Sequence, residues 1–111
     1  MIIPKDIEDL ASFVETGTNV FCFVTDWCGD CRYLQPFFPE IEADFPAFQF
    51  IEVDRDHYID IAKIWDIIGV PSFMVVKNGK VVDRFVSKKR KTKGEVEAFL
   101  QQATNKLQEG E

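Results

Sequence analysis

Two thiols separated by two residues, Cys28 and Cys31, are the side chains whose types and spacing best fit a chemical role. An apolar run at 20–24 precedes them and a segment with helical spacing follows, so we expect them where a strand ends and a helix begins. The free N–H groups and positive dipole end of such a helix stabilise a thiolate and make it nucleophilic at neutral pH. The second sulfur is close enough to close a disulfide with the first. The spacing therefore predicts reversible disulfide exchange.

The composition is that of one small globular domain. Of the 111 residues, 46% are hydrophobic and eleven are phenylalanine, which is enough for a core without disulfide staples. Three cysteines do not form the framework of a small secreted protein, and neither a signal peptide nor a membrane-spanning stretch is evident. We therefore expect a single, monomeric domain over residues 1–111, cytoplasmic and without a membrane partner.

Charge is distributed unevenly along the chain. The net charge is −6, yet five of the thirteen basic residues fall in one short run, namely Lys88, Lys89, Arg90, Lys91 and Lys93. One basic run on an acidic domain is a weak nucleic-acid signal, so we expect no nucleic-acid partner. We interpret the run as a solvated loop before the last helix.

The spacing of apolar residues predicts the order of the elements. It indicates helices at 5–16, 32–44, 56–69 and 96–107, and strands at 20–25, 47–53, 73–77 and 80–85. Pro36 should kink the second helix, Gly69 should end the third, and Asn78-Gly79 should turn a hairpin. Strands joined through helices should run parallel, with the hairpin adding antiparallel strands at one edge. These elements predict an α/β fold with a mixed central sheet flanked by helices on both faces.

Several motifs resemble those of the thioredoxin family. Trp27-Cys28-Gly29-Asp30-Cys31 resembles the family's Trp-Cys-Gly-Pro-Cys, and Gly69-Val70-Pro71-Ser72 resembles its Gly-Ile-Pro-Thr segment, whose proline is cis. Pro36 stands where the kinking proline follows the second cysteine, and Lys77-Asn78-Gly79-Lys80 is similar to the last hairpin turn. These motifs occur in order over nearly the whole chain. The resemblance implies the thioredoxin fold.

The resemblance also implies roles for individual residues. Cys28 would be the attacking thiolate and Cys31 the buried resolving thiol. Trp27, Val70 and Pro71 would form the apolar surface against which an extended substrate lies, with a cis bond before Pro71. The substrates would be protein disulfides or mixed disulfides, and the electrons would come from a flavoprotein thioredoxin reductase. No cofactor is implied beyond the redox-active disulfide Cys28–Cys31.

The chain departs from the family pattern at four positions. Cys22 stands where thioredoxins carry a buried aspartate, and Phe50 stands where they carry its lysine partner. Ser87 replaces a glycine beside the substrate groove, which should make the docking surface narrower or more polar. Asp30 replaces the proline between the two cysteines.

Asp30 admits more than one role. Its carboxylate would disfavour a nearby thiolate by like-charge repulsion, which Arg32 would offset, or it would transfer protons in place of the absent aspartate. A third reading is an exposed carboxylate that caps the helix. We interpret Cys22 as a small buried apolar residue, although a third thiol could also trap a disulfide with Cys31. His57 is interpreted as a surface residue.

Two alternatives to an enzyme stay open. The dithiol could hold zinc or a shared iron–sulfur cluster, although the spacing of Cys22, Cys28, Cys31 and His57 does not fit a zinc knuckle. A redox-sensing protein could instead use the basic run to dock a partner. The prediction that the residue pattern favours is a thiol-disulfide oxidoreductase.

Overall fold

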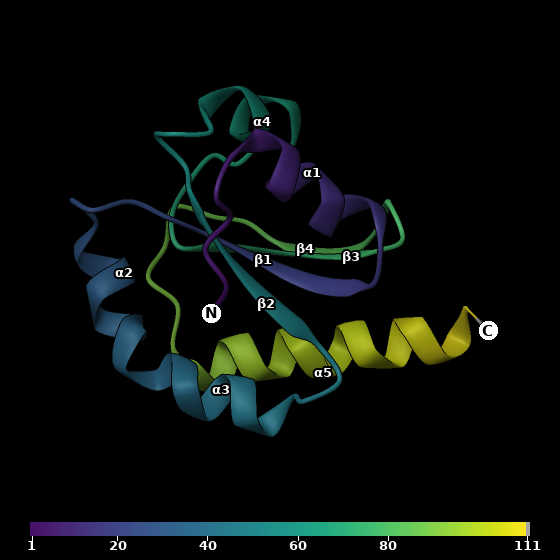
Figure 1. Cartoon of the computed structure of the whole chain (residues 1–111). Helices are drawn as coiled ribbons and strands as arrows, with labels where there is room; N and C mark the ends of the chain where they lie inside the picture. Colours follow the sequence, from purple (N-terminus) through teal and green to yellow (C-terminus); the bar gives the residue numbers. More distant parts are fainter. Residues whose placement is uncertain (111) are drawn as a thin grey trace.

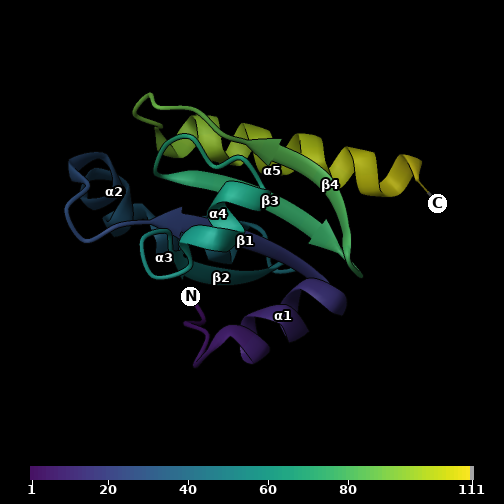
Figure 2. The same ribbon diagram turned by 90° about the horizontal axis from the view of Figure 1, so that it is seen from above.

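The computed structural model describes residues 1–110 and has a sheet between two layers of helices (Figures 1 and 2). The chain runs in the order α1 (Ile7–Glu15), β1 (Thr18–Val24), α2 (Gly29–Leu34), a 3₁₀ turn η1 (Gln35–Phe37), α3 (Phe38–Asp44), β2 (Gln49–Asp54), α4 (Ile59–Ile64), β3 (Ser72–Lys77), β4 (Lys80–Phe85) and α5 (Lys93–Glu109). Glu111, the last residue of the expected domain, lies outside the described residues. In the described part, no helix is both long and apolar enough to cross a bilayer.

The sheet has the strand order β2-β1-β3-β4 in the described part of the chain, with β1 in its interior. Successive side chains of a strand point to opposite faces, and both faces of β1 are covered. Val20 and Cys22 pack on the face covered by α3 and α5, whereas Phe21 and Phe23 pack on the face covered by α1 and α4. The predicted α/β class with a mixed sheet flanked on both faces is confirmed.

The hairpin adds antiparallel strands at one edge of the sheet, as expected, but the expectation that all strands joined through helices run parallel is wrong. The connection through α2 and α3 does make β1 and β2 parallel, but β3, which follows α4, runs antiparallel to β1. The connection at 55–71, which includes α4, does not return the chain to the opposite end of the sheet, so β3 starts at the end where β2 stops.

Two helices are shorter than the periodicity predicts. The segment expected to be one kinked helix at 32–44 is divided into α2 and α3 by the 3₁₀ turn η1, which contains Pro36. The helix expected to end at Gly69 ends at Ile64, because Asp66 adopts the left-handed conformation with φ 54° and the Ile67 N–H closes the end on the Ala62 carbonyl. Polar residues that accept positive φ can stop a helix as glycine does.

The hairpin and the last helix form where the sequence indicates. Asn78 and Gly79 both have positive φ, as a two-residue turn of type I′ requires. The helix α5 extends beyond the predicted 96–107 at both ends. Its start is fixed by a capping box, in which Thr92 and Glu95 exchange side-chain hydrogen bonds with each other's backbone N–H groups.

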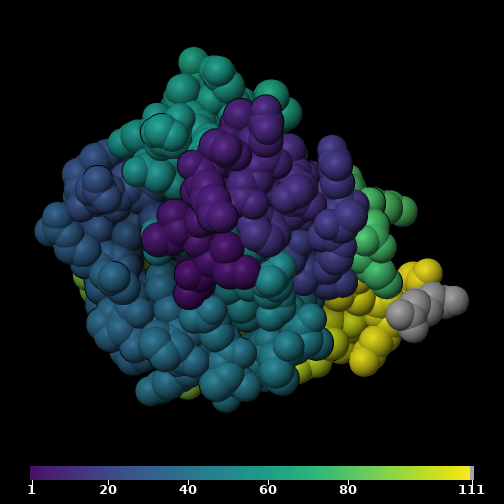
Figure 3. Space-filling view, in the orientation of Figure 1, coloured from purple at the N-terminus to yellow at the C-terminus, as the bar shows by residue number. Residues whose placement is uncertain are grey.

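The N-terminal segment covers the outer edge of β2. Ile2 bridges to Ile51 in parallel, its N–H donates to the Phe50 carbonyl, and its own carbonyl accepts from Glu52. The space-filling view shows this segment, in purple, seated between the blue and teal parts of the chain (Figure 3). The bonds satisfy backbone groups that an open strand edge would expose.

Gly69 is needed for a close approach rather than for a helix end. A Cβ atom at this position would lie 2.3 Å from the Ser87 carbonyl oxygen and 2.7 Å from the Lys88 Cα. We expect Gly69→Ala to lower the free energy of unfolding by about 1–3 kcal/mol, because backbone must move to make room. Urea denaturation measures the change.

The control for this substitution is Gly94→Ala in α5, where the nearest atom to an added Cβ is 4.0 Å away. Alanine favours the helix, so this variant should be as stable as the parent or slightly more stable. Equal stability of Gly69→Ala and the parent would contradict the close approach.

Candidate functional site

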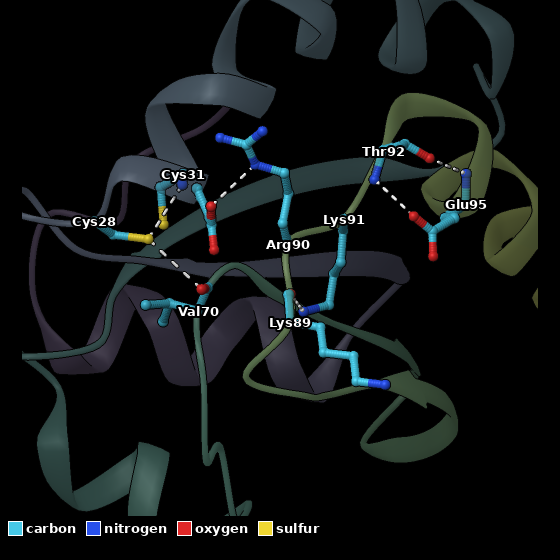
Figure 4. A network of polar contacts seen from close by, with 9 residues as sticks. Cys28, Cys31, Val70, Lys89, Arg90, Lys91, Thr92 and Glu95 are labelled. Atoms are coloured by element: carbon cyan, nitrogen blue, oxygen red, sulfur yellow. Dashed lines mark hydrogen bonds and ion pairs between the residues drawn. The ribbon is translucent and has the colours of Figure 1, made fainter.

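The two expected redox cysteines lie together at the start of α2. Cys28 is the N-cap residue of this helix, and its sulfur accepts a hydrogen bond of 3.1 Å from the Cys31 N–H. The Cys28 thiol is also 3.5 Å from the Val70 carbonyl oxygen, to which it donates (Figure 4). The strand β1 ends four residues earlier, so the sheet and the helix together fix the position of the dithiol. A free N–H aimed at the sulfur is a contact that stabilises a thiolate.

The second cysteine has a different environment. Burial, followed by the hydrogen bond with Cys28, raises the pKa of Cys31 to about 12. Cys31 therefore carries its proton at neutral pH, whereas the Cys28 sulfur accepts the hydrogen bond from the Cys31 backbone N–H. This asymmetry is what an attacking thiol and a resolving thiol require.

A groove of about 400 Å³ opens above Cys28. Its lining comprises Trp27, Cys28, Gly29, Asp30, Arg55, Ile68, Gly69, Val70 and Lys88. Trp27 is 63% exposed, and the bond between Val70 and Pro71 is cis, as expected. Pro71 itself is buried, so the Val70 backbone rather than the proline ring borders the groove.

Trp27 is held by two residues that the sequence pattern did not single out. Its indole N–H donates to Asp56 at 2.7 Å, and the Arg55 guanidinium lies 5.7 Å from the ring centroid. Arg55 also pairs with Asp56 at 3.0 Å. Both residues follow β2, which pairs with β1, and only this pairing brings them beside the tryptophan.

Asp30 is neutralised by a residue distant in sequence. Its carboxylate accepts from Arg90 Nε at 3.1 Å, whereas the Arg32 side chain donates to the Asp26 carbonyl at 2.9 Å. The expectation that Arg32 offsets Asp30 is therefore wrong. The cation comes instead from the basic run before α5.

The interpretation of the basic run as a solvated loop is wrong for Lys91. This residue is only 1% exposed, and its ammonium donates to the carbonyls of Ser87 and Lys89, each at 3.1 Å. It also lies 5.3 Å from the Phe85 ring centroid. Burial lowers the pKa of Lys91, while the charges of Asp30 and Cys31 act in the opposite sense. Nothing in the local sequence distinguishes this lysine from its exposed neighbours.

The remaining departures from the family pattern, Cys22 and Ser87, lie outside the groove. Cys22 is fully buried in the core beside Phe50, and burial, followed by the influence of Cys31, raises the pKa of its thiol well above the usual value. Ser87 does not narrow the groove, because its hydroxyl accepts from the Lys89 N–H and Lys88 lines the groove instead.

His57 is exposed, as expected. Among residues 1–110, no three His, Cys, Asp or Glu side chains are grouped to hold a metal ion.

A dithiol at a strand-to-helix junction, below a groove and beside a cis-proline, defines the class of thiol-disulfide exchange proteins. Comparison with known proteins is more specific. The family model Thioredoxin matches residues 6–102. This chain therefore belongs to the thioredoxin family, whose members exchange disulfides through such a dithiol and need no further cofactor.

Individual relatives support the assignment. The chain is 38% identical to Thioredoxin H1 of Arabidopsis thaliana over 84 residues, which is 75% of this chain and 74% of that protein. It is 41% identical to Thioredoxin H-type of Picea mariana over 68 residues, 61% of this chain and 54% of that protein, so this match spans about half of the relative. The crystal structure of thioredoxin from Trypanosoma brucei brucei has a TM-score of 0.81 at 20% identity, covers 95% of this chain and 91% of that one, and shows the same fold.

The three thiols should differ sharply in reactivity. We expect iodoacetamide to modify Cys28 first in the reduced native protein, and Cys22 only after unfolding, because Cys22 is fully buried. In Cys28→Ser, alkylation of Cys31 should be slow at neutral pH and should rise with pH, because burial, the largest cause of its raised pKa, remains in the variant. Peptide mass spectrometry measures both results. Rapid labelling of Cys22 in the native protein would contradict its position.

Proposed function

We propose that this chain reduces protein disulfides or mixed disulfides by dithiol exchange through Cys28 and Cys31. The observation that supports the proposal is the 3.1 Å hydrogen bond from the Cys31 N–H to the Cys28 sulfur at the floor of the groove. It favours the thiolate on the sulfur that a substrate reaches. We further propose that the protein acts as a cytoplasmic monomer without a nucleic-acid or membrane partner.

The reaction proceeds in two exchanges. The Cys28 thiolate attacks one sulfur of the substrate, the substrate disulfide breaks, and the departing thiolate takes up a proton. Cys31 then loses its proton and attacks the Cys28 sulfur, which forms the Cys28–Cys31 disulfide and releases the second substrate thiol. Two electrons pass to the substrate. A flavoprotein thioredoxin reductase would return them to the dithiol.

Substrate binding uses the groove beside Trp27. An extended substrate segment can pair with the Val70 backbone as an added strand does, which places its sulfur next to Cys28. The exposed faces of Trp27 and Ile68 supply apolar contact. Pro71, buried behind Val70, supports this backbone segment rather than the substrate directly.

The proposal is tested with insulin as the disulfide substrate and dithiothreitol as the reductant. The native chain should accelerate insulin reduction, and Cys28→Ser should reduce the rate to the background of dithiothreitol alone. Cys31→Ser should accumulate a mixed disulfide through Cys28, because the resolving thiol is absent. Non-reducing electrophoresis and mass spectrometry detect this adduct.

Cys22→Ala provides the matched control, since it removes a thiol of the core without touching the groove. It should keep the insulin rate while losing about 1 kcal/mol of stability. Full activity of Cys28→Ser would refute the proposal. Stoichiometric zinc or iron in protein purified without chelator would favour the metal-binding alternative.

Asp30 is proposed to assist proton transfer during exchange. Its carboxylate is partly exposed and lies between the two cysteines in the chain. If it carries protons, Asp30→Asn should slow insulin reduction, and the loss should change across about pH 6 to pH 8. A profile identical to that of the native chain over this range would exclude this role.

A further inference from the structure

The segment 87–91 is built into the active site although it lies far from the cysteines in sequence. Gly69 and Ser87 are in close backbone contact, and Lys88 lines the groove above Cys28. Arg90 reaches α2 and contacts two of its side chains, the Asp30 carboxylate at 3.1 Å and the Tyr33 ring at 4.2 Å from its centroid. The segment therefore contacts both sides of the groove that holds the dithiol.

Lys91 determines how this segment is folded. Its buried ammonium donates to the carbonyls of Ser87 and Lys89, so one charge ties together the residues on both sides of Lys88. Burying an ammonium is costly unless hydrogen bonds compensate, and these two carbonyls with the Phe85 ring provide the compensation. Figure 4 shows the Lys91 side chain turned back along the segment, whereas the Arg90 side chain extends toward α2, where it pairs with Asp30.

Arg90 has an electrostatic consequence for Cys28. Asp30 is the carboxylate placed between the two cysteines, and an unpaired carboxylate there would disfavour a thiolate by like-charge repulsion. The Arg90 guanidinium lies 3.1 Å from that carboxylate and offsets its repulsion of a thiolate. The other charged groups that line the groove are Arg55, which is already paired with Asp56, and Lys88. The buried Lys91 ammonium also interacts electrostatically with Asp30 and Cys31.

We propose that Arg90 maintains the nucleophilicity of Cys28 by neutralising Asp30, and that the buried Lys91 is a positioning residue that holds Arg90 in place. The proposal concerns the reactivity of the same dithiol and in that sense rests on the proposed function. It assigns a role to two members of the basic run, whereas Lys93 of the same run pairs with Glu40 away from the dithiol.

A double-mutant cycle tests the pair. The readout is the rate at which iodoacetamide, an uncharged reagent, alkylates Cys28 of the reduced protein at pH 7. Arg90→Gln should slow alkylation about two- to fivefold, the range that a surface ion pair supports, and Asp30→Asn should speed it. The double variant should return close to the native rate, because both charges are then absent.

The positioning role of Lys91 is tested in the same assay. Lys91→Met keeps a long buried side chain but removes the charge, and should slow alkylation as Arg90→Gln does. Adding Lys91→Met to Arg90→Gln should cause no further slowing, because Lys91 acts through Arg90. Further slowing would show that the Lys91 charge acts directly on Asp30 and Cys31, and would overturn the positioning role. Lys93→Gln, which removes a cation of the run that pairs with Glu40, should leave the rate unchanged.

Several results would overturn the proposal. Equal alkylation rates of Arg90→Gln and the native chain would show that the ion pair does not act on Cys28. If Arg90→Gln slowed alkylation equally with Asp30 and with Asn at position 30, the effect of Arg90 would not depend on neutralising Asp30. The cycle of Arg90 and Asp30 uses partly exposed side chains, so it decides the proposal even if Lys91→Met weakens the fold. Alkylation needs no disulfide substrate, so a failure here is distinct from a failure to reduce insulin.

Discussion

The site depends on one junction, where the buried strand β1 ends and α2 begins at Cys28. The strand is covered on both faces and cannot move without opening the core, so the backbone that follows it is fixed. The Cys31 N–H then falls at 3.1 Å from the Cys28 sulfur. Both cysteines are buried, but Cys28 borders the groove beside Trp27 and Val70, whereas burial keeps Cys31 protonated by raising its pKa.

The charges around this junction come from three separate parts of the chain. The carboxylate of Asp30 belongs to α2, Arg55 follows β2, and Arg90 lies before α5. The family's buried aspartate and lysine are replaced by Cys22 and Phe50, which only fill the core. The charges near this dithiol are therefore exposed ion pairs, which solvent and salt can modulate, together with the buried Lys91 ammonium.

The segment between β4 and α5 illustrates how a local pattern can mislead. Five cations in six residues are typical of an exposed loop, and Lys88 and Lys89 are indeed exposed. Lys91 differs because the carbonyls of its own loop and the Phe85 ring surround it. The same segment explains Gly69. The periodicity predicted a helix end there, whereas in the structure the absence of a side chain leaves room for the Ser87 backbone.

Features that depend on neighbours in sequence could be predicted from sequence. The strand before Cys28, the helix start at the dithiol and the Asn78-Gly79 hairpin follow from apolar spacing and turn preferences, which act over a few residues. The cis bond before Pro71 was implied by the family resemblance and is present. The direction of β3 could not be predicted in this way, because it depends on the end of the sheet to which the connection at 55–71 leads.

The partners of the site residues were decided by the tertiary structure. Arg90 is sixty positions from Asp30, and Asp56 is twenty-nine from Trp27, so no local pattern links either pair. Arg32 is closer to Asp30 in sequence, yet its side chain bonds to the Asp26 carbonyl. The sequence alone thus indicated which residues we propose for the chemistry, since thiols at this spacing have a distinctive reactivity. The fold determined the charges that act on them, because electrostatic interactions depend on distance in space rather than along the chain.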